Sequence, residues 1–162
     1  MTPPTLLLPA TIVVDATSPA GATVTYSVSA SDDRDPNPVV ICSPPSGNVF
    51  PLLVTNVSCA ATDDAGNSAS GTFQVVVLDA TQQLQQTIDV VASYALTRLG
   101  TSLSDKLQLA MGFSASADVR QACGVLTGFL NEVRAQSGKA LSVEQATELT
   151  RRGIRIRNVI GC

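Results

Sequence analysis

The distribution of proline divides this sequence into two parts. All nine prolines lie before Asp79, and none follows it as far as Cys162. The hydrophobic pattern changes at the same place, from alternation with a period of two residues to the spacing of a helix. Proline interrupts helices but suits turns and strand ends, so the two patterns agree. The 162 residues therefore predict two small domains, the first built from strands and the second from helices.

Short β-branched runs separated by Gly, Pro and Asp turns fill the first part. The clearest is 22–30, in which the valines and the tyrosine share one face. Residues 1–10 (MTPPTLLLPA) are expected to form an extended leader or linker, and 11–79 an all-β sandwich of the immunoglobulin or fibronectin kind. The strands are expected at 11–16, 22–30, 39–42, 52–61 and 71–78.

Residues 80–162 predict an all-α bundle of four helices. The helices are expected at 79–99, 102–111, 115–136 and 142–160. Two glycines are expected to end the first and second helices, Gly100 and Gly112. Caps are available for the first and last helices: Asp79 or Thr81, and a capping box of Ser142 with Gln145.

Four cysteines constrain the compartment: Cys42, Cys59, Cys123 and Cys162. Four cysteines allow three pairings. No two of the cysteines form a C-x-x-C motif, and no histidine is present to complete a set of zinc ligands. We expect two structural disulfides, one in each half, which implies an oxidising, extracellular or cell-surface location. Free buried thiols, or metal or redox chemistry, are the alternatives. The start of the chain has no basic region and its apolar run is too short for a signal peptide, which is typical of a mature or excised fragment.

The absence of histidine also bears on catalysis. It removes the most common general base and the usual partner of a nucleophilic serine or cysteine. The acidic residues could be imagined as a glycosidase pair, but no aromatic platform for a sugar accompanies them. We therefore expect a protein that is not an enzyme.

Two acidic loops, SDDRDP at 31–36 and TDDAGN at 62–67, are expected at the same pole of the sandwich. Oxygen ligands from two loops suit Ca²⁺, which takes six to eight of them. The other interpretation is that Asp and Asn form turns here and are satisfied by Arg34 or by backbone amides. The candidate calcium ligands are Asp32, Asp33, Asp35, Asp63 and Asp64.

Three further features could mediate interactions. Asn56 begins a glycosylation sequon within a predicted strand. The apolar run Leu6, Leu7 and Leu8 could add a strand to the sheet of a neighbouring copy. The charge is about −6 through Asp79 and about +3 beyond it, so a basic last helix could contact an acidic surface, or its arginines could form a solvated face. These arginines are Arg151, Arg152, Arg155 and Arg157.

The first part resembles the hyalin repeat (HYR) domains, which are small extracellular β-sandwiches. The shared features are Pro9 before the first strand, the loop SASDDRDP, the segment C-x-PP-SG-x-x-FP from Cys42, the second cysteine in V-x-C-x-A-x-D, and AGN. The sequence departs from the family at Leu52-Leu53, where a glycine usually follows FP, so the geometry of that turn is open.

Residues 80–162 resemble the C-terminal helical modules called FIMAH, which are appended to secreted prokaryotic proteins. The shared phrases are SLSDKLQLA, ACGVLTGFLNEVRAQSGKALSVEQATELTRRG and the final IGC. The resemblance implies an accessory module without known chemistry, and it supports a bond between Cys123 and Cys162.

Together these observations predict an extracellular structural or adhesive protein, such as a subunit of a surface polymer or filament. The alternative is a C-terminal accessory region of a larger secreted enzyme, which would bind carbohydrate or a surface or act as a spacer. The expected partners are copies of the chain, other extracellular proteins or a surface, with no nucleic acid and no transmembrane segment. No cofactor is expected apart from the Ca²⁺ of the acidic loops.

Overall fold

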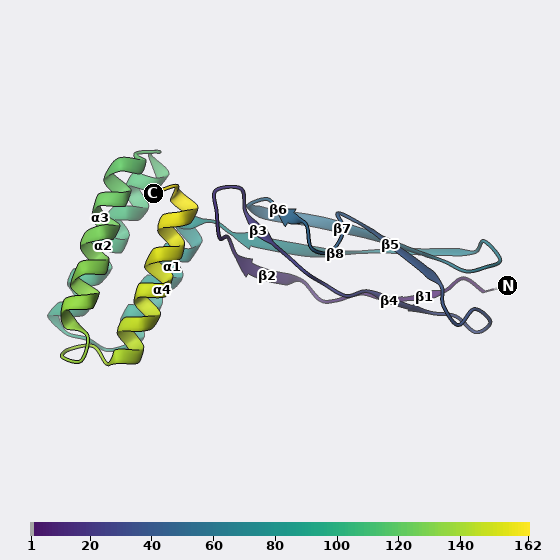
Figure 1. Cartoon of the computed structure of the whole chain (residues 1–162), viewed down its shortest axis with the longest axis horizontal. Coiled ribbons are helices and arrows are strands. Elements are labelled where there is room, and N and C mark those ends of the chain that lie inside the picture. Colours follow the sequence, from purple (N-terminus) through teal and green to yellow (C-terminus); the bar gives the residue numbers. More distant parts are fainter. Residues whose placement is uncertain (1) are drawn as a thin grey trace. The chain divides into compact units, whose positions relative to one another are not determined.

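The computed structural model describes residues 2–162 and divides into two compact units (Figure 1). The first unit contains the chain up to Val14 and Ala22–Val77, and the second contains Asp15–Gly21 and Leu78–Cys162. The prediction of a β domain followed by four helices is confirmed. The units do not follow the expected boundary in one respect, because a segment inside the predicted sandwich belongs to the helical unit.

The first unit contains one four-stranded sheet, in the order β2-β8-β7-β5, and two two-stranded sheets, β1-β4 and β3-β6. Strand β5 pairs antiparallel with β7, and β7 pairs antiparallel with β8, so these three strands lie side by side (Figure 1). The strands are β1 (Thr5–Leu7), β2 (Ile12–Asp15), β3 (Ala22–Thr23), β4 (Ser29–Ser31), β5 (Val39–Ser43), β6 (Val49–Phe50), β7 (Leu53–Thr62) and β8 (Ser68–Leu78).

The core of this unit follows from strict alternation along β7 and β8. Successive side chains of a strand point to opposite faces, so every second residue points inward, and the inward residues are buried in β7 from Val57 and in β8 from Phe73. Tyr26 covers this core, with its ring edge-on to Phe73 at 4.9 Å and to Phe50 at 6.4 Å between centroids. The buried residues of the two strands are Val57, Cys59, Ala61, Phe73, Val75 and Val77.

The predicted strand 22–30 is interrupted, and only its two ends are strands. At Tyr26 the hydroxyl of Ser46 replaces a backbone partner: the Tyr26 amide donates to Ser46 Oγ at 2.8 Å, and this hydroxyl donates to the Tyr26 carbonyl at 2.8 Å. Gly47, whose φ is 87°, makes the turn that brings the serine there. The Ser-Gly pair therefore joins the two runs of chain.

The predicted leader or linker, residues 1–10, contains a strand of the fold. Strand β1 pairs with β4, with Leu6 opposite Ala30. Leu8 then lies against β8 at Gly71, where an added Cβ would lie 2.6 Å from the Leu8 Cδ1 atom. The leucine run thus has a place in its own fold, because Gly71 leaves room for it.

The helical unit contains α1 (Ala80–Ser93), α2 (Arg98–Ala115), α3 (Val119–Gln136) and α4 (Val143–Ile160). The apolar stripes of all four helices meet in one core. Within residues 2–162, no helix is long and apolar enough to cross a membrane. The largest fully buried side chains of this core are Leu84, Leu103, Leu107, Leu126, Phe129, Leu141, Leu149 and Ile156.

Neither glycine ends a helix where it was expected to do so. The first helix already ends at Ser93, and Ala95 adopts a positive φ of 51° beyond it. Gly100 lies in the first turn of α2 and is buried, with room for no more than a tight Cβ contact to Leu96. Gly112 lies inside the same helix. Glycine therefore marks close packing rather than termination at Gly100.

The expected caps of the first and last helices are present. The Asp79 carboxylate accepts from the Gln82 amide at 2.9 Å, and the Gln82 side chain accepts from the Asp79 amide at 3.0 Å. Ser142 and Gln145 form the same reciprocal pair. The third helix starts later than expected, at Val119, because Asp118 caps it.

Each unit contains one disulfide, in the pairing that was expected. Cys42 on β5 and Cys59 on β7 are directly opposite one another, with their Cα atoms 4.1 Å apart. Such proximity is typical of the non-hydrogen-bonded pair of an antiparallel ladder. Cys123 on α3 is bonded to the C-terminal Cys162, with Cα atoms 5.6 Å apart. The second bond therefore attaches the end of the chain to the bundle.

Candidate functional site

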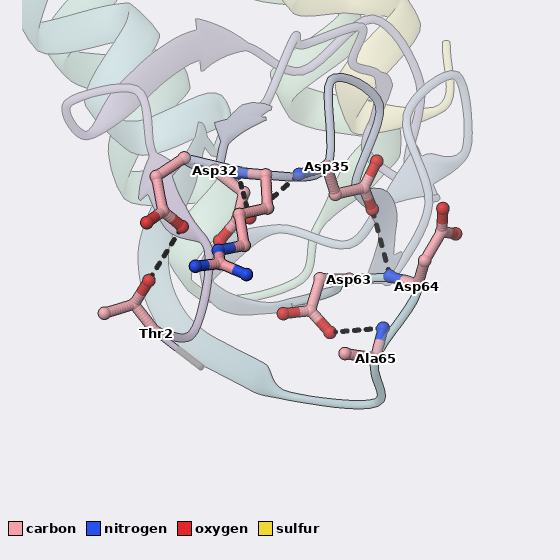
Figure 2. Close-up of a pocket in the computed structure, with 8 residues that line it drawn as sticks. Thr2, Asp32, Asp35, Asp63, Asp64 and Ala65 are labelled. Atoms are coloured by element: carbon pink, nitrogen blue, oxygen red, sulfur yellow. Dashed lines mark hydrogen bonds between the residues drawn. The ribbon is translucent and has the colours of Figure 1, made fainter.

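The two acidic loops lie together at one end of the first unit, as predicted. They surround a cavity of about 120 Å³, which the N-terminal Thr2 also lines (Figure 2). The cavity is small and partly open to solvent. We call this region the acidic pole, and its residues are Asp32, Asp33, Arg34, Asp35, Asp63 and Asp64.

Asp35 connects the two loops of the acidic pole. The side chain is buried, with 7% of the residue exposed. One carboxylate oxygen accepts from the Asn37 amide at 2.8 Å, and the other accepts from the Asp64 amide at 3.1 Å. Both oxygens of this carboxylate therefore accept hydrogen bonds from backbone amides, one in each loop.

Asp63 organises its own loop in the same way. Its Oδ1 atom accepts from the amides of Ala65 at 2.9 Å and Asn67 at 2.8 Å, and its Oδ2 atom accepts from the Asn67 side chain at 2.7 Å. These bonds favour the ionised form, with the Asn67 side chain as the largest cause, so they hold the pKa of the Asp63 carboxyl below its usual value. This is the geometry of a turn-forming aspartate.

Asp32 caps the turn that follows it. Its Oδ1 atom accepts from the amides of Arg34 at 2.9 Å and Asp35 at 3.0 Å, whereas its Oδ2 atom is buried without a hydrogen-bond partner. Asp33 accepts a hydrogen bond of 2.8 Å from the Thr2 hydroxyl. Within residues 2–162, no group of three or more His, Cys, Asp or Glu side chains is arranged to hold a metal ion. Proximity of the five acids was predicted, but their geometry favours the turn-forming interpretation over the calcium interpretation.

The arginines of the last helix are largely engaged within the chain. Arg151 and Arg152 both bind Glu148, at 2.8 and 2.6 Å. These bonds hold the pKa of the Glu148 carboxyl below its usual value, with the Arg151 hydrogen bond as the largest cause. Arg157 lies partly covered near Cys162, and its buried Nε atom has no partner. Most of these arginine side chains therefore do not form a freely solvated basic face.

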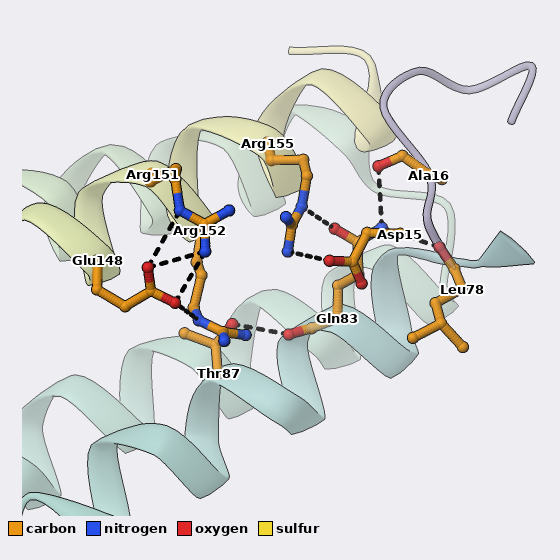
Figure 3. Close-up of polar contacts among 9 residues, drawn as sticks. All are labelled: Asp15, Ala16, Leu78, Gln83, Thr87, Glu148, Arg151, Arg152 and Arg155. Carbon is orange, nitrogen blue, oxygen red and sulfur yellow. Dashed lines mark hydrogen bonds and ion pairs between the residues drawn. The ribbon is translucent and has the colours of Figure 1, made fainter. Parts of the chain in front are cut away.

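Arg155 participates in a partly buried polar network (Figure 3). Its guanidinium binds the Asp15 carboxylate at 2.6 Å and donates from Nε to the Gln83 side-chain oxygen at 2.9 Å. Burial lowers the pKa of this guanidinium, and the neighbouring Asp15 opposes that shift. The Gln83 amide nitrogen donates to the carbonyls of Ala16 at 3.1 Å and Leu78 at 2.8 Å. The network thereby attaches segment Asp15–Gly21 to α1 and α4.

Gln83 was missed by reasoning from the sequence. It lies in a glutamine run that suggested a polar helix face, yet it is fully buried. Helical spacing offers a signal in retrospect, because Gln83, Leu84 and Thr87 fall on one side of α1 and are all buried, whereas Gln82, Gln85 and Gln86 are exposed.

The outer side of the sheet formed by β5, β7 and β8 has no charged side chain. The alternation that buries one face of these strands exposes the other, and every position of the outer face is exposed except Val76 and Leu78, which are half-buried near the end of β8. We call this surface the neutral face. Its residues are Val39, Ile41, Ser43, Val54, Asn56, Ser58, Ala60, Thr62, Ser68, Ser70, Thr72, Gln74 and Val76.

The remaining predicted residues lie apart from one another. Asn56 is exposed on the neutral face, where its side-chain oxygen accepts from Gln74 at 3.2 Å, so the sequon is accessible. Leu7 is 71% exposed, whereas Leu6 and Leu8 are half-buried. The neutral face was not predicted from the sequence.

Comparison with known proteins agrees with this architecture. Residues 1–77 match the family model of the HYR domain. This is an extracellular, adhesion-like domain family with an immunoglobulin-like fold, and both the fold and the disulfides found here fit an extracellular location. No curated protein matches the chain. The match covers the first unit, and the resemblance of the four helices to FIMAH modules stays a prediction.

Proposed function

We propose that this protein is a non-enzymatic, extracellular structural or adhesive subunit that assembles with copies of itself into a surface polymer. The neutral face is the observation that carries the proposal. A sheet face exposed to water in a monomeric protein is usually mixed with charged residues, which also protect sheet edges from association. The neutral face has no charged side chain. It also includes β5, which lies at the edge of the sheet and pairs on one side only among the described strands.

The distribution of charge strengthens this argument. The charged side chains of the first unit are those of the acidic pole, so its strands have no charged residue except Asp15, which ends β2 and belongs to the second unit. Repulsion between copies would therefore act at one end of the unit and not across its sheets. This pattern suits a subunit that packs closely against its neighbours along its sheets and keeps one charged end in water.

The state of the acidic side chains supports the non-enzymatic part of the proposal. General acid or base catalysis requires a carboxyl group that can reach a substrate and exchange a proton. Asp35 and Asp63 instead use their oxygens to bind loop amides. The carboxylate of Glu148 is occupied by two arginines.

The proposal is tested by measuring the mass of the full chain in solution. Sedimentation velocity from micromolar to millimolar concentration should show a rising average mass, and negative-stain microscopy of native material should show polymers. A monomer at every concentration, together with a catalytic domain upstream in the same open reading frame, would instead support the accessory region of a secreted enzyme.

A further inference from the structure

The geometry points to the neutral face as the surface through which two copies of this chain associate, with one outer sheet packed on the other. This inference rests on the proposed function, because it names the contact that self-assembly would use. The chemistry of the face, its charge and its area all favour this contact.

The chemistry of the face suits close approach by another flat sheet. Its side chains are short or β-branched, and hydroxyl groups lie opposite one another across the strands, as in the pair Ser58 and Thr72. Apolar residues occupy both ends, with Ile41 69% exposed on β5 and Val54 57% exposed on β7. Small side chains allow sheets to pack at about 10 Å, and hydroxyls can both donate and accept.

The charge of the face selects a neutral partner. It offers no counter-charge to an acidic or basic protein, and its many hydroxyl and amide groups make it too polar to enter a lipid bilayer. It has no aromatic side chain on which a sugar ring could stack, since Tyr26, Phe50 and Phe73 lie on the inner side of the sheet. A second neutral face satisfies these requirements, because identical hydroxyl and β-branched groups complement one another without repulsion.

The area of the face is sufficient for a specific contact. Strands β5, β7 and β8 contain 5, 10 and 11 residues. With about 3.4 Å per residue and about 4.8 Å between strands, they cover roughly 400 Å² in projection. Side-chain relief raises the accessible area above this projection, so two copies would bury on the order of 1,000 Å², the lower end for specific interfaces. Reversible association of moderate affinity is therefore expected.

Charge placed on the face tests the inference in the full-length protein. The double variant Ser58→Lys/Thr72→Lys introduces like charges at the centre of the contact. It should weaken self-association in sedimentation velocity by at least about tenfold, because like charges oppose each other across an interface. Thr23→Lys is the matched control: Thr23 is an exposed threonine of β3, outside the neutral face, and this variant should associate as the wild type does.

A complementary pair of variants guards against simple misfolding. Ser58→Asp/Thr72→Asp should also fail to associate alone, and mixing it with the lysine variant should restore a complex. Unchanged association of the lysine variant, or no complex in the mixture, overturns the inference while leaving self-assembly through another surface intact. A glycan on Asn56 of native material, found by mass spectrometry, also overturns it, because the sugar would cover the same face. A wild-type chain that never associates contradicts the proposed function itself.

Discussion

Arg155, in the last helix, forms an ion pair with Asp15, which precedes the third strand in the sequence, at 2.6 Å. From their positions in the sequence, the two residues would be assigned to different units. Gln83 completes the arrangement by binding Arg155 and two backbone carbonyls. The stability of the helical unit should therefore depend on a segment that the sequence places within the sandwich.

Replacing Gln83 by alanine should destabilise the protein by about 2–4 kcal/mol, since it leaves the carbonyls of Ala16 and Leu78 and the Arg155 guanidinium short of a partner in a buried site. Chemical denaturation monitored by circular dichroism measures this free energy. Gln86→Ala, at an exposed position of the same helix, is the control and should change stability by less than about 0.5 kcal/mol. Equal effects of the two substitutions would show that the network contributes nothing.

The pairing of Glu148 with two arginines should make stability depend on pH. The folded-state pKa of Glu148 lies below the ordinary value of 4.5, so its stabilising effect is fully present above that pH and is lost as pH falls through the folded pKa. Because the side chain is 32% exposed, the effect should be small, about 0.5–1 kcal/mol. Denaturation midpoints of wild type and Glu148→Gln should therefore converge as the pH is lowered, and a constant difference would contradict this assignment.

Leu53→Gly should stabilise the protein despite removing a side chain. Leu53 has a φ of 74°, a left-handed conformation that costs a residue with a Cβ about 1–2 kcal/mol, and its side chain is 55% exposed. The greater freedom of glycine in the unfolded chain offsets part of this, so a net gain of about 0.5 kcal/mol is expected. Val54→Gly, next to it in ordinary extended backbone, is the control and should destabilise. A lower melting temperature for Leu53→Gly would show that the leucine contributes contacts that outweigh its strain.

The acidic pole should behave as a turn and not as a calcium site. The melting temperature of the wild type should be the same in calcium and in EDTA, because Asp35 and Asp63 already bind amides. Asp63→Ala should lower it in both solutions, whereas Asp33→Ala, which loses one exposed bond to Thr2, should have little effect. A calcium-dependent increase in wild type that is absent from Asp63→Ala would restore the metal hypothesis.

The elements that the sequence predicted well are those whose pattern is local. Alternation along 52–61 and 71–78 identified the two long strands, and a three-residue spacing identified the capping box of Ser142 and Gln145. The acidic loops were also placed together correctly, because a sandwich brings alternate loops to one pole. Their chemistry was harder to predict, since the same aspartates suit a metal or a turn until the direction of each oxygen is known.

The features that were missed depend on contacts between distant parts of the chain. The space above Gly71 accepts Leu8, and this contact makes the leader part of the fold. Gln83 is polar by type, and only the carbonyls that it meets explain its burial. Predicting the neutral face would have required the register of three strands, because exposure depends on which face of the sheet each residue occupies.

The return of Asp15–Gly21 to the helical unit has a consequence for synthesis. Asp15 emerges roughly 140 residues before Arg155, and at about 5–20 residues per second it would wait on the order of ten seconds for its partner. Strands β7 and β8 are complete well before α4 exists, so the early chain can pair its sheets while this segment is still unbound. The final step of maturation would then be the arrival of the last helix, which positions Arg155 and brings Cys162 within reach of Cys123.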